Sequence, residues 1–262
     1  MAPVDPNLGS PRILCLHGGG VNGKVFRLQC RALLSGGLAN HFRLVFPNGP
    51  FPCDAHPAIA PVYGDYGPFY RWLRWEEFHE KLDARHTAIE VLDHLCTQMD
   101  ADEGTGEWVG VLGFSQGAKL AASLLWEQEH IKGPVPLLRA DVRFRFGVFM
   151  AGSAPLVLFD PHGTLGPPPK HIDTAETIGM QFTDWPINNM GNHAISSPTL
   201  HVHGRQDPGI QGHRKLWEYY VKPGSAKLFE WDGDHRIPLK TTDVMPVVNE
   251  IIAMAKKSGL LM

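Results

Sequence analysis

The chain has 262 residues, of which 43% are hydrophobic and 19% are charged, so a sizeable apolar core can form. The 24 basic residues against 27 acidic ones give a net charge of −3, which argues against a nucleic-acid-binding protein. No apolar run approaches the roughly 18 residues of a membrane-spanning helix, and no basic region followed by an apolar run marks a signal peptide. We therefore expect a soluble, cytoplasmic protein with no membrane span and no nucleic-acid partner.

Apolar periodicity predicts strands that alternate with helices along the chain. In order, the expected elements are strand 12–16, a helix from Asn22, strand 43–46, helix 85–99, strand 108–112, helix 118–126, strand 143–150, strand 199–202, helix 211–221, strand 227–231 and helix 241–257. This alternation implies an α/β fold, with a mostly parallel sheet and helices on both faces. We expect a single domain over residues 1–262.

Two segments interrupt the alternation, at residues 50–78 and 154–197. The first is rich in proline, glycine and aromatic residues, and the second contains three consecutive prolines at 167–169. Long connections inside a compact domain are usually functional or disordered, and the first segment is too aromatic for disorder. We expect insertions that form a pocket wall or lid, with Tyr66, Phe69 and Trp185 contacting substrate. The alternative is a surface loop held by its own aromatic residues.

Residues 113–117, with the sequence GFSQG, fit the G-x-S-x-G pattern that presents a nucleophilic serine between a strand and a helix. A short apolar run precedes the motif, and an Ala- and Leu-rich helical stretch follows it, as this turn requires. We expect Ser115 to adopt a strained positive φ, with the flanking glycines tolerating the close passage of neighbouring chain.

A serine hydroxyl needs a base to accept its proton, and an acid must orient that base. Histidine suits the base because its pKa lies near neutrality. In this fold the acid and the histidine follow the serine in that order, and each lies just past a strand. Asp207 and His235 meet both conditions, so we predict Ser115, Asp207 and His235 as the catalytic residues.

Other residues compete for these roles. The alternative acids are Asp160, Asp184, Asp232 and Asp234. The last two flank the predicted histidine too closely to orient its ring from a separate loop. His201 and His203 alternate on an expected strand and could suit a metal, but no acid or cysteine lies nearby at ligand spacing. The four cysteines lack metal or redox spacing, and two of them fall in expected buried elements, so we expect reduced core thiols. We predict neither a metal nor a cofactor.

The glycine-rich loop after the first strand supplies a candidate oxyanion hole. Its sequence, His17-Gly18-Gly19-Gly20, lets backbone approach a substrate oxygen closely. We predict that the Gly19 and Gln116 N–H groups bind the oxyanion, with Gly18 and Gly20 as neighbouring substrate contacts. The alternative is a phosphate-binding turn, but the loop has neither the Walker lysine spacing nor the G-x-G-x-x-G pattern.

These motifs together, at 14–23, 113–118, 203–207 and 234–238, resemble the fungal serine hydrolase family. That family includes ovarian-tumour-suppressor-candidate-like hydrolases and stand-alone thioesterases of fungal polyketide clusters. The resemblance extends over about residues 11–252. It implies a compact α/β-hydrolase whose sheet begins without a leading hairpin, and it implies the same three catalytic residues. The segment 154–197 departs from the family pattern, so the substrate is the least transferable property.

In the cluster-associated members, the resemblance implies hydrolysis of an acyl thioester or ester that releases a polyketide from its carrier protein. We therefore expect a hydrophobic acyl substrate, with a polyketide synthase or acyl carrier protein as partner. The alternatives are a general carboxylesterase acting on small esters, a C–C hydrolase or cyclase with the same three residues, and a non-catalytic ligand-binding α/β-hydrolase.

Overall fold

Six parallel strands form the central sheet of the computed structural model, which describes residues 6–131, 138, 141–163, 169–175, 177 and 182–261. The strands are β1 (Arg12–Leu16), β2 (Arg43–Val45), β5 (Trp108–Phe114), β6 (Val142–Met150), β9 (Thr199–Gly204) and β10 (Ala226–Trp231). Their order across the sheet is β10-β9-β6-β5-β1-β2, and every neighbouring pair is parallel. The first described strand, β1, lies inside this sheet, so the α/β prediction without a leading hairpin is confirmed.

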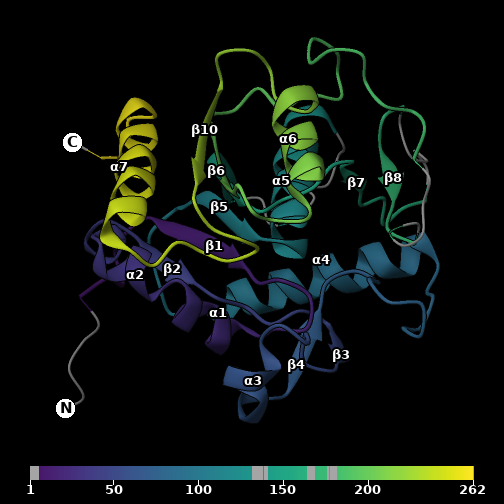
Figure 1. The fold of residues 1–262 in the computed structure, drawn as a ribbon, viewed down its shortest axis with the longest axis horizontal. Coiled ribbons are helices and arrows are strands. Elements are labelled where there is room, and N and C mark those ends of the chain that lie inside the picture. The colour runs from purple at the N-terminus through teal and green to yellow at the C-terminus, as the bar shows by residue number, and fades with distance from the viewer. Residues whose placement is uncertain are drawn as a thin grey trace.

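Helices cover both faces of the sheet (Figure 1). They are α1 (Gly23–Gln29), α2 (Arg31–Ser35), α4 (Ala84–Asp100), α5 (Gln116–His130), α6 (Ile210–Tyr219) and α7 (Thr241–Lys257). Successive β1 side chains alternate between the faces, as a strand requires. Ile13 and Cys15 pack in a core with residues of α1, α2 and α7. Leu14 and Leu16 pack in a second core with residues of α4, α5 and α6.

The helix expected from Asn22 is two helices, because the backbone leaves helical geometry at Cys30 (φ −81°, ψ 2°). Asn22 itself is the N-cap: its side-chain oxygen accepts a 2.8 Å hydrogen bond from the Val25 N–H. Its amide nitrogen donates to the Tyr66 and Pro68 carbonyls, each at 2.8 Å. One side chain therefore begins α1 and fastens the insertion at 50–78 to it.

The insertion at 50–78 contains structure that the sequence did not predict. Strands β3 (Phe51–Cys53) and β4 (Phe69–Arg71) pair antiparallel, with Cys53 opposite Phe69. The short helix α3 (Ala60–Tyr63) and two single turns of 3₁₀-helix, η1 (Leu38–Asn40) and η2 (Gly64–Tyr66), complete the described helical segments. The β3–β4 ladder holds together the two ends of the intervening loop.

The described part of segment 154–197 packs against α5 instead of covering the serine. Its strands β7 (Val157–Leu158) and β8 (Ile172–Asp173) form a small parallel pair. The Val157 N–H donates to Ser123 Oγ at 2.9 Å, and the Phe159 N–H donates to the buried Glu127 carboxyl at 2.5 Å. Residues 164–168, which include two of the three consecutive prolines, lie outside the described residues.

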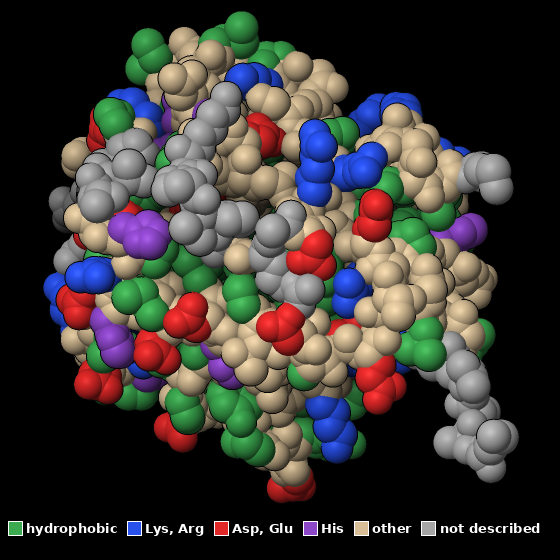
Figure 2. Space-filling model, turned by 180° about the vertical axis from the view of Figure 1, so that it is seen from behind, with side chains coloured by type: hydrophobic (Ala, Val, Ile, Leu, Met, Phe, Trp, Pro, Cys, Tyr) green, Lys and Arg blue, Asp and Glu red, His purple; other side chains and the backbone are tan. Residues whose placement is uncertain are grey.

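The described surface carries charges of both signs. On the face seen in Figure 2, Lys and Arg side chains lie among Asp and Glu side chains, consistent with the small net charge. Among the helices of the described residues, none is long and apolar enough to cross a membrane. All four cysteines are free, and Cys15 and Cys30 are buried.

Candidate active site

Ser115 stands on a strained turn between β5 and α5. Its φ and ψ are 54° and −118°, a region that non-glycine residues rarely occupy. The flanking glycines are required by space: a Cβ on Gly113 would lie 2.2 Å from the Gly117 carbonyl oxygen. A Cβ on Gly117 would lie 2.0 Å from the Leu16 oxygen of β1. The motif therefore has the conformation and the crowding that the sequence predicts.

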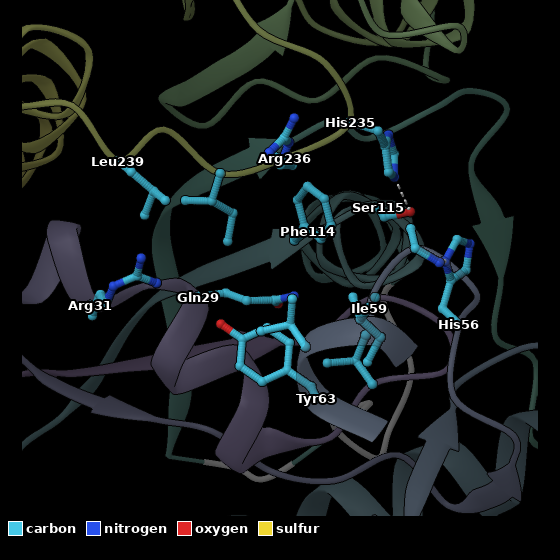
Figure 3. A pocket seen from close by; sticks show the side chains of 16 residues that line it. Gln29, Arg31, His56, Ile59, Tyr63, Phe114, Ser115, His235, Arg236 and Leu239 are labelled. Atoms are coloured by element: carbon cyan, nitrogen blue, oxygen red, sulfur yellow. Dashed lines mark hydrogen bonds between the residues drawn. The ribbon is translucent and has the colours of Figure 1, made fainter. Parts of the chain in front are cut away.

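A chain of hydrogen bonds joins Ser115, His235 and Asp207. His235 Nε2 lies 2.9 Å from Ser115 Oγ, the contact dashed in Figure 3. On its other side, His235 Nδ1 lies 2.6 Å from Asp207 Oδ2. Asp207 follows β9 and His235 follows β10, so both come from the carboxyl edge of the sheet. This arrangement can move a proton from the serine to the imidazole while the carboxylate stabilises the resulting charge.

Asp207 is held in its charged form by several donors. Its side chain is 2% exposed, and its Oδ1 accepts a 2.8 Å hydrogen bond from the Gly209 N–H. Its Oδ2 accepts from His235 and also from His213 Nε2, at 2.9 Å. Burial by itself would raise the pKa of this carboxyl. The hydrogen bonds from the Gly209 amide and the two histidines outweigh burial and hold the pKa below its ordinary value.

His213 is a site residue that the sequence reasoning missed. It lies on α6 with a side chain 2% exposed, and its Nδ1 is 2.9 Å from Ser153 Oγ. Burial lowers the pKa of His213, and Asp207 only partly offsets this effect, so the ring is neutral at pH 7. A neutral ring with its proton on Nε2 donates to Asp207 and accepts from Ser153. The sequence contains one signal for this residue: His213 lies three and seven residues before the apolar Leu216 and Tyr220, a helical spacing that places it on the buried face.

Two backbone N–H groups near Ser115 are available to bind an oxyanion. Within the described residues, the amides of Gly19 and Gln116 donate to no protein acceptor. The Gly20 amide, by contrast, donates to the Tyr70 carbonyl at 3.0 Å. Gly18 and Gly19 line the cavity beside Ser115, but Gly20 does not. Gly20 instead holds β4 through its amide, and its contact with substrate stays a prediction.

The Gln116 side chain fastens α5 to the segment after β4. Its Oε1 accepts from the Trp72 and Leu73 amides at 2.8 and 3.2 Å, and its Nε2 donates to the Leu73 carbonyl at 2.9 Å. The Trp72 indole donates to the His17 carbonyl at 2.9 Å. Burial lowers the pKa of His17 to about 4, and the neutral ring accepts the Gly49 N–H at 2.9 Å. The glycine-rich loop at 17–20 and the Ser115 turn are thus both hydrogen-bonded to the segment that follows β4.

A cavity of about 310 Å³ opens beside Ser115, and its walls are mostly apolar. The residues lining it are Gly18, Gly19, Val21, Gln29, Arg31, His56, Ala58, Ile59, Val62, Tyr63, Phe114, Ser115, His235, Arg236, Ile237 and Leu239. Figure 3 shows His56 at the Ser115 end, and Arg31 and Leu239 at the other. The insertion at 50–78 does form a pocket wall, through residues 56–63, whereas no described residue of 154–197 lines the cavity.

The three aromatic residues predicted to contact substrate lie outside this cavity. Tyr66 is 38% exposed beneath the Lys24 ammonium, and Phe69 is a core residue only 7% exposed. Trp185 stacks with the Lys215 ammonium at 3.8 Å. Their contact with substrate therefore stays a prediction, because aromatic composition does not show which side chains face Ser115.

Among the described residues, one group of three side chains brings possible metal-ligand atoms close together. Asp207, His213 and His235 have ligand atoms within 4.8 Å of one another, but their contacts are those of the hydrogen-bonded chain. His201 and His203 are both fully buried, and burial lowers the pKa of His203 to about 4. Their rings are therefore neutral side chains within the sheet.

The parallel sheet, the strand–turn–helix at Ser115 and the Ser–His–Asp chain at the carboxyl edge define a serine hydrolase of the α/β-hydrolase class. Residues 8–247 match the family model described as "Serine hydrolase (FSH1)". The chain belongs to this serine hydrolase family and is a hydrolase enzyme.

Named relatives and solved structures agree with this assignment. The chain is 43% identical to Esterase claE of Penicillium crustosum, over 95% of this chain and 94% of that protein. It is also 43% identical to Esterase citA of Monascus ruber, over 98% and 96%. Among solved structures, acyl-protein thioesterase 2 of Zea mays shares the fold, with a TM-score of 0.54 at 17% identity over 97% and 96% of the two chains.

Proposed function

We propose that this enzyme cleaves an acyl thioester or carboxylic ester through an acyl-enzyme on Ser115, releasing a polyketide or similar hydrophobic acyl chain in secondary metabolism. The observation that carries the proposal is the Ser115–His235–Asp207 chain, which opens onto a largely apolar cavity. The similarity to proteins named as esterases supports the reaction class. A carrier protein or polyketide synthase is the proposed source of the acyl group.

In the first half-reaction, Ser115 Oγ attacks the carbonyl carbon while His235 Nε2 takes the hydroxyl proton. The Gly19 and Gln116 N–H groups bind the oxygen that becomes negative, and removing one such donor typically costs about 3 kcal/mol in the barrier. The intermediate collapses as the C–S or C–O bond breaks, and His235 gives its proton to the leaving sulfur or oxygen. Ionised Asp207 stabilises the imidazolium in between.

In the second half-reaction, water attacks the acyl-enzyme while His235 takes one of its protons. The tetrahedral intermediate expels Ser115 Oγ, which recovers that proton from His235, and the free acid leaves. Each half-reaction therefore returns the imidazole to its neutral state.

Ser115→Ala tests the nucleophile. The variant should fold normally and lose both ester hydrolysis and covalent labelling by a fluorophosphonate probe. Ser35→Ala, at an exposed site on α2, is the matched control and should label like wild type. Labelling of Ser115→Ala at the wild-type rate would disprove the assignment.

The leaving group is tested by comparing substrates with the same acyl chain. We expect a larger kcat/KM for a carrier-bound acyl thioester than for the nitrophenyl ester of the same acid. The alternative, a carboxylesterase acting on small esters, predicts the reverse ranking.

A further inference from the structure

The cavity beside Ser115 has a polar end opposite the serine. Gln29 ends α1, Arg31 begins α2 and Tyr63 ends α3, so three separate helix ends bring polar side chains together there. In Figure 3, Arg31 lies at the end of the cavity away from Ser115, and the Tyr63 hydroxyl points toward the same side. Arg31 is exposed to solvent at this end, and Gln29 and Tyr63 are partly buried.

No anion among the described residues neutralises the charge of Arg31. Its guanidinium donates to the Leu28 carbonyl at 3.1 Å, and no carboxylate of the described residues lies within ion-pair distance of it. Arg236, the other arginine on the cavity wall, is different because Asp234 binds it through two hydrogen bonds of 2.6 and 2.7 Å. Only the Arg31 guanidinium therefore keeps its forked donors available for a ligand.

Gln29 has a polar atom that lacks a partner. Its Oε1 is buried, and no described residue donates a hydrogen bond to it. A ligand hydroxyl can donate to this acceptor, whereas an ionised carboxylate cannot, so Gln29 would bind an anion through the two donors of its amide nitrogen. A glutamine amide offers both an acceptor and two donors, which suits a group with several oxygens.

We propose that this end of the cavity, formed by Gln29, Arg31 and Tyr63, binds an oxyanion at the end of the acyl chain remote from the reacting carbonyl. The inference rests on the proposed function, because it assumes that the cavity holds the acyl group of an ester or thioester. The substrate class is then an acyl chain that is apolar in its middle and carries a carboxylate at its far end. A phosphate on the leaving group shares the anion chemistry and is the competing source.

The test compares two series of nitrophenyl esters of increasing chain length, one made from plain monoacids and one from the matching half-esters of dicarboxylic acids. At the best length, wild type should prefer the carboxylate-ended ester. Arg31→Leu should lower kcat/KM for that ester by about tenfold to a hundredfold, the equivalent of a charge-assisted hydrogen bond, and leave the plain ester within about twofold. Gln29→Leu should act in the same direction.

Arg27→Leu is the matched control, since it removes the same charge from the neighbouring helix at an exposed site outside the cavity. It should keep the wild-type preference. Equal losses for both ester series in Arg31→Leu, or no preference for the carboxylate at any length in wild type, would overturn the proposal. A loss confined to phosphopantetheinyl thioesters, compared with N-acetylcysteamine thioesters, would place the anion on the leaving group and also overturn it. Failure of wild type to hydrolyse any ester, by contrast, would refute the proposed function itself.

Discussion

Replacing His213 with leucine should raise the pKa of the Asp207 carboxyl. The change removes a 2.9 Å hydrogen bond to Asp207 Oδ2, in a site where both side chains are 2% exposed. A hydrogen bond to a charged group contributes about 1.5–3 kcal/mol, which equals about one to two pKa units. Because neutral His213 donates to the charged form of Asp207, its removal should raise the pKa of this carboxyl by that amount. The Gly209 and His235 bonds remain, so Asp207 should still be ionised at pH 7.

A more basic Asp207 holds the imidazolium form of His235 more tightly. Because the reaction starts from the neutral imidazole, the acid limb of the kcat/KM profile should move to higher pH, by up to about one unit. The assay is nitrophenyl ester hydrolysis from pH 5 to 9, with active sites counted by a fluorophosphonate. His213→Gln is the matched control, since its amide can donate to Asp207 and accept from Ser153, and it should restore most of the wild-type profile.

The reasoning fails if His213→Leu retains the wild-type acid limb, or if the glutamine variant shifts it equally far. Urea denaturation of both variants distinguishes a role of His213 in stabilising the Asp207 charge from a role in packing. A loss of stability in the leucine variant with an unchanged acid limb would mean that His213 only fills space beside Asp207.

Three further predictions follow from the same geometry. Asp207→Asn should lower kcat by about 10⁴-fold with the fold retained, as loss of the orienting carboxylate does in serine proteases, and near-wild-type turnover would exclude its role. Gly117→Ala should cost more than about 3 kcal/mol of unfolding free energy because its Cβ meets backbone oxygen, whereas Gly64→Ala, with open space around it, should stay within about 0.5 kcal/mol. Burial lowers the pKa of three histidines to about 4: His17, His171 and His203. The unfolded chain binds protons at these rings as pH falls from about 6.5, so between that pH and about 4 these three rings should together lower the free energy of unfolding by roughly 4 kcal/mol per pH unit. His203→Leu should remove about a third of this three-ring contribution, as measured by urea denaturation at a series of pH values.

The order of strands and helices was readable from the sequence because each long element carries its own apolar periodicity. The Ser115 turn could be predicted for a different reason. Crowding against β1 allows only glycine beside the serine, so the constraint shows within five consecutive residues of the sequence. Asp207 and His235 followed from chain order and from their places just past strands. The hairpin of β3 and β4 was not readable, since each strand has three residues and Pro52 interrupts one of them.

The walls of the cavity were the least predictable part. Which side chains face Ser115 depends on how three helix ends and the loop after β10 pack together. No local sequence pattern predicts that packing. Gln29 and Arg31 look like solvent-facing positions of an amphipathic helix, so the helical pattern hides them. Tyr66 and Phe69 were predicted as substrate contacts because they are aromatic. In the structure, the Tyr66 ring contacts the Lys24 ammonium, and Phe69 packs in the core.

The antiparallel pairing of Cys53 with Phe69 makes the intervening loop an exchangeable unit. The ladder brings the loop ends together, so changing its length adds little closure entropy: doubling it costs only about 0.6 kcal/mol. Its hydrogen bonds to the rest of the chain at residues 56, 66 and 68 use backbone atoms of the loop, which other sequences can supply equally well, whereas its ring contacts, such as that of His56 with Trp75, depend on side chains. Loops grafted from relatives at this junction should therefore carry their own acyl preference with them while the hydrolytic machinery on the strand ends stays unchanged.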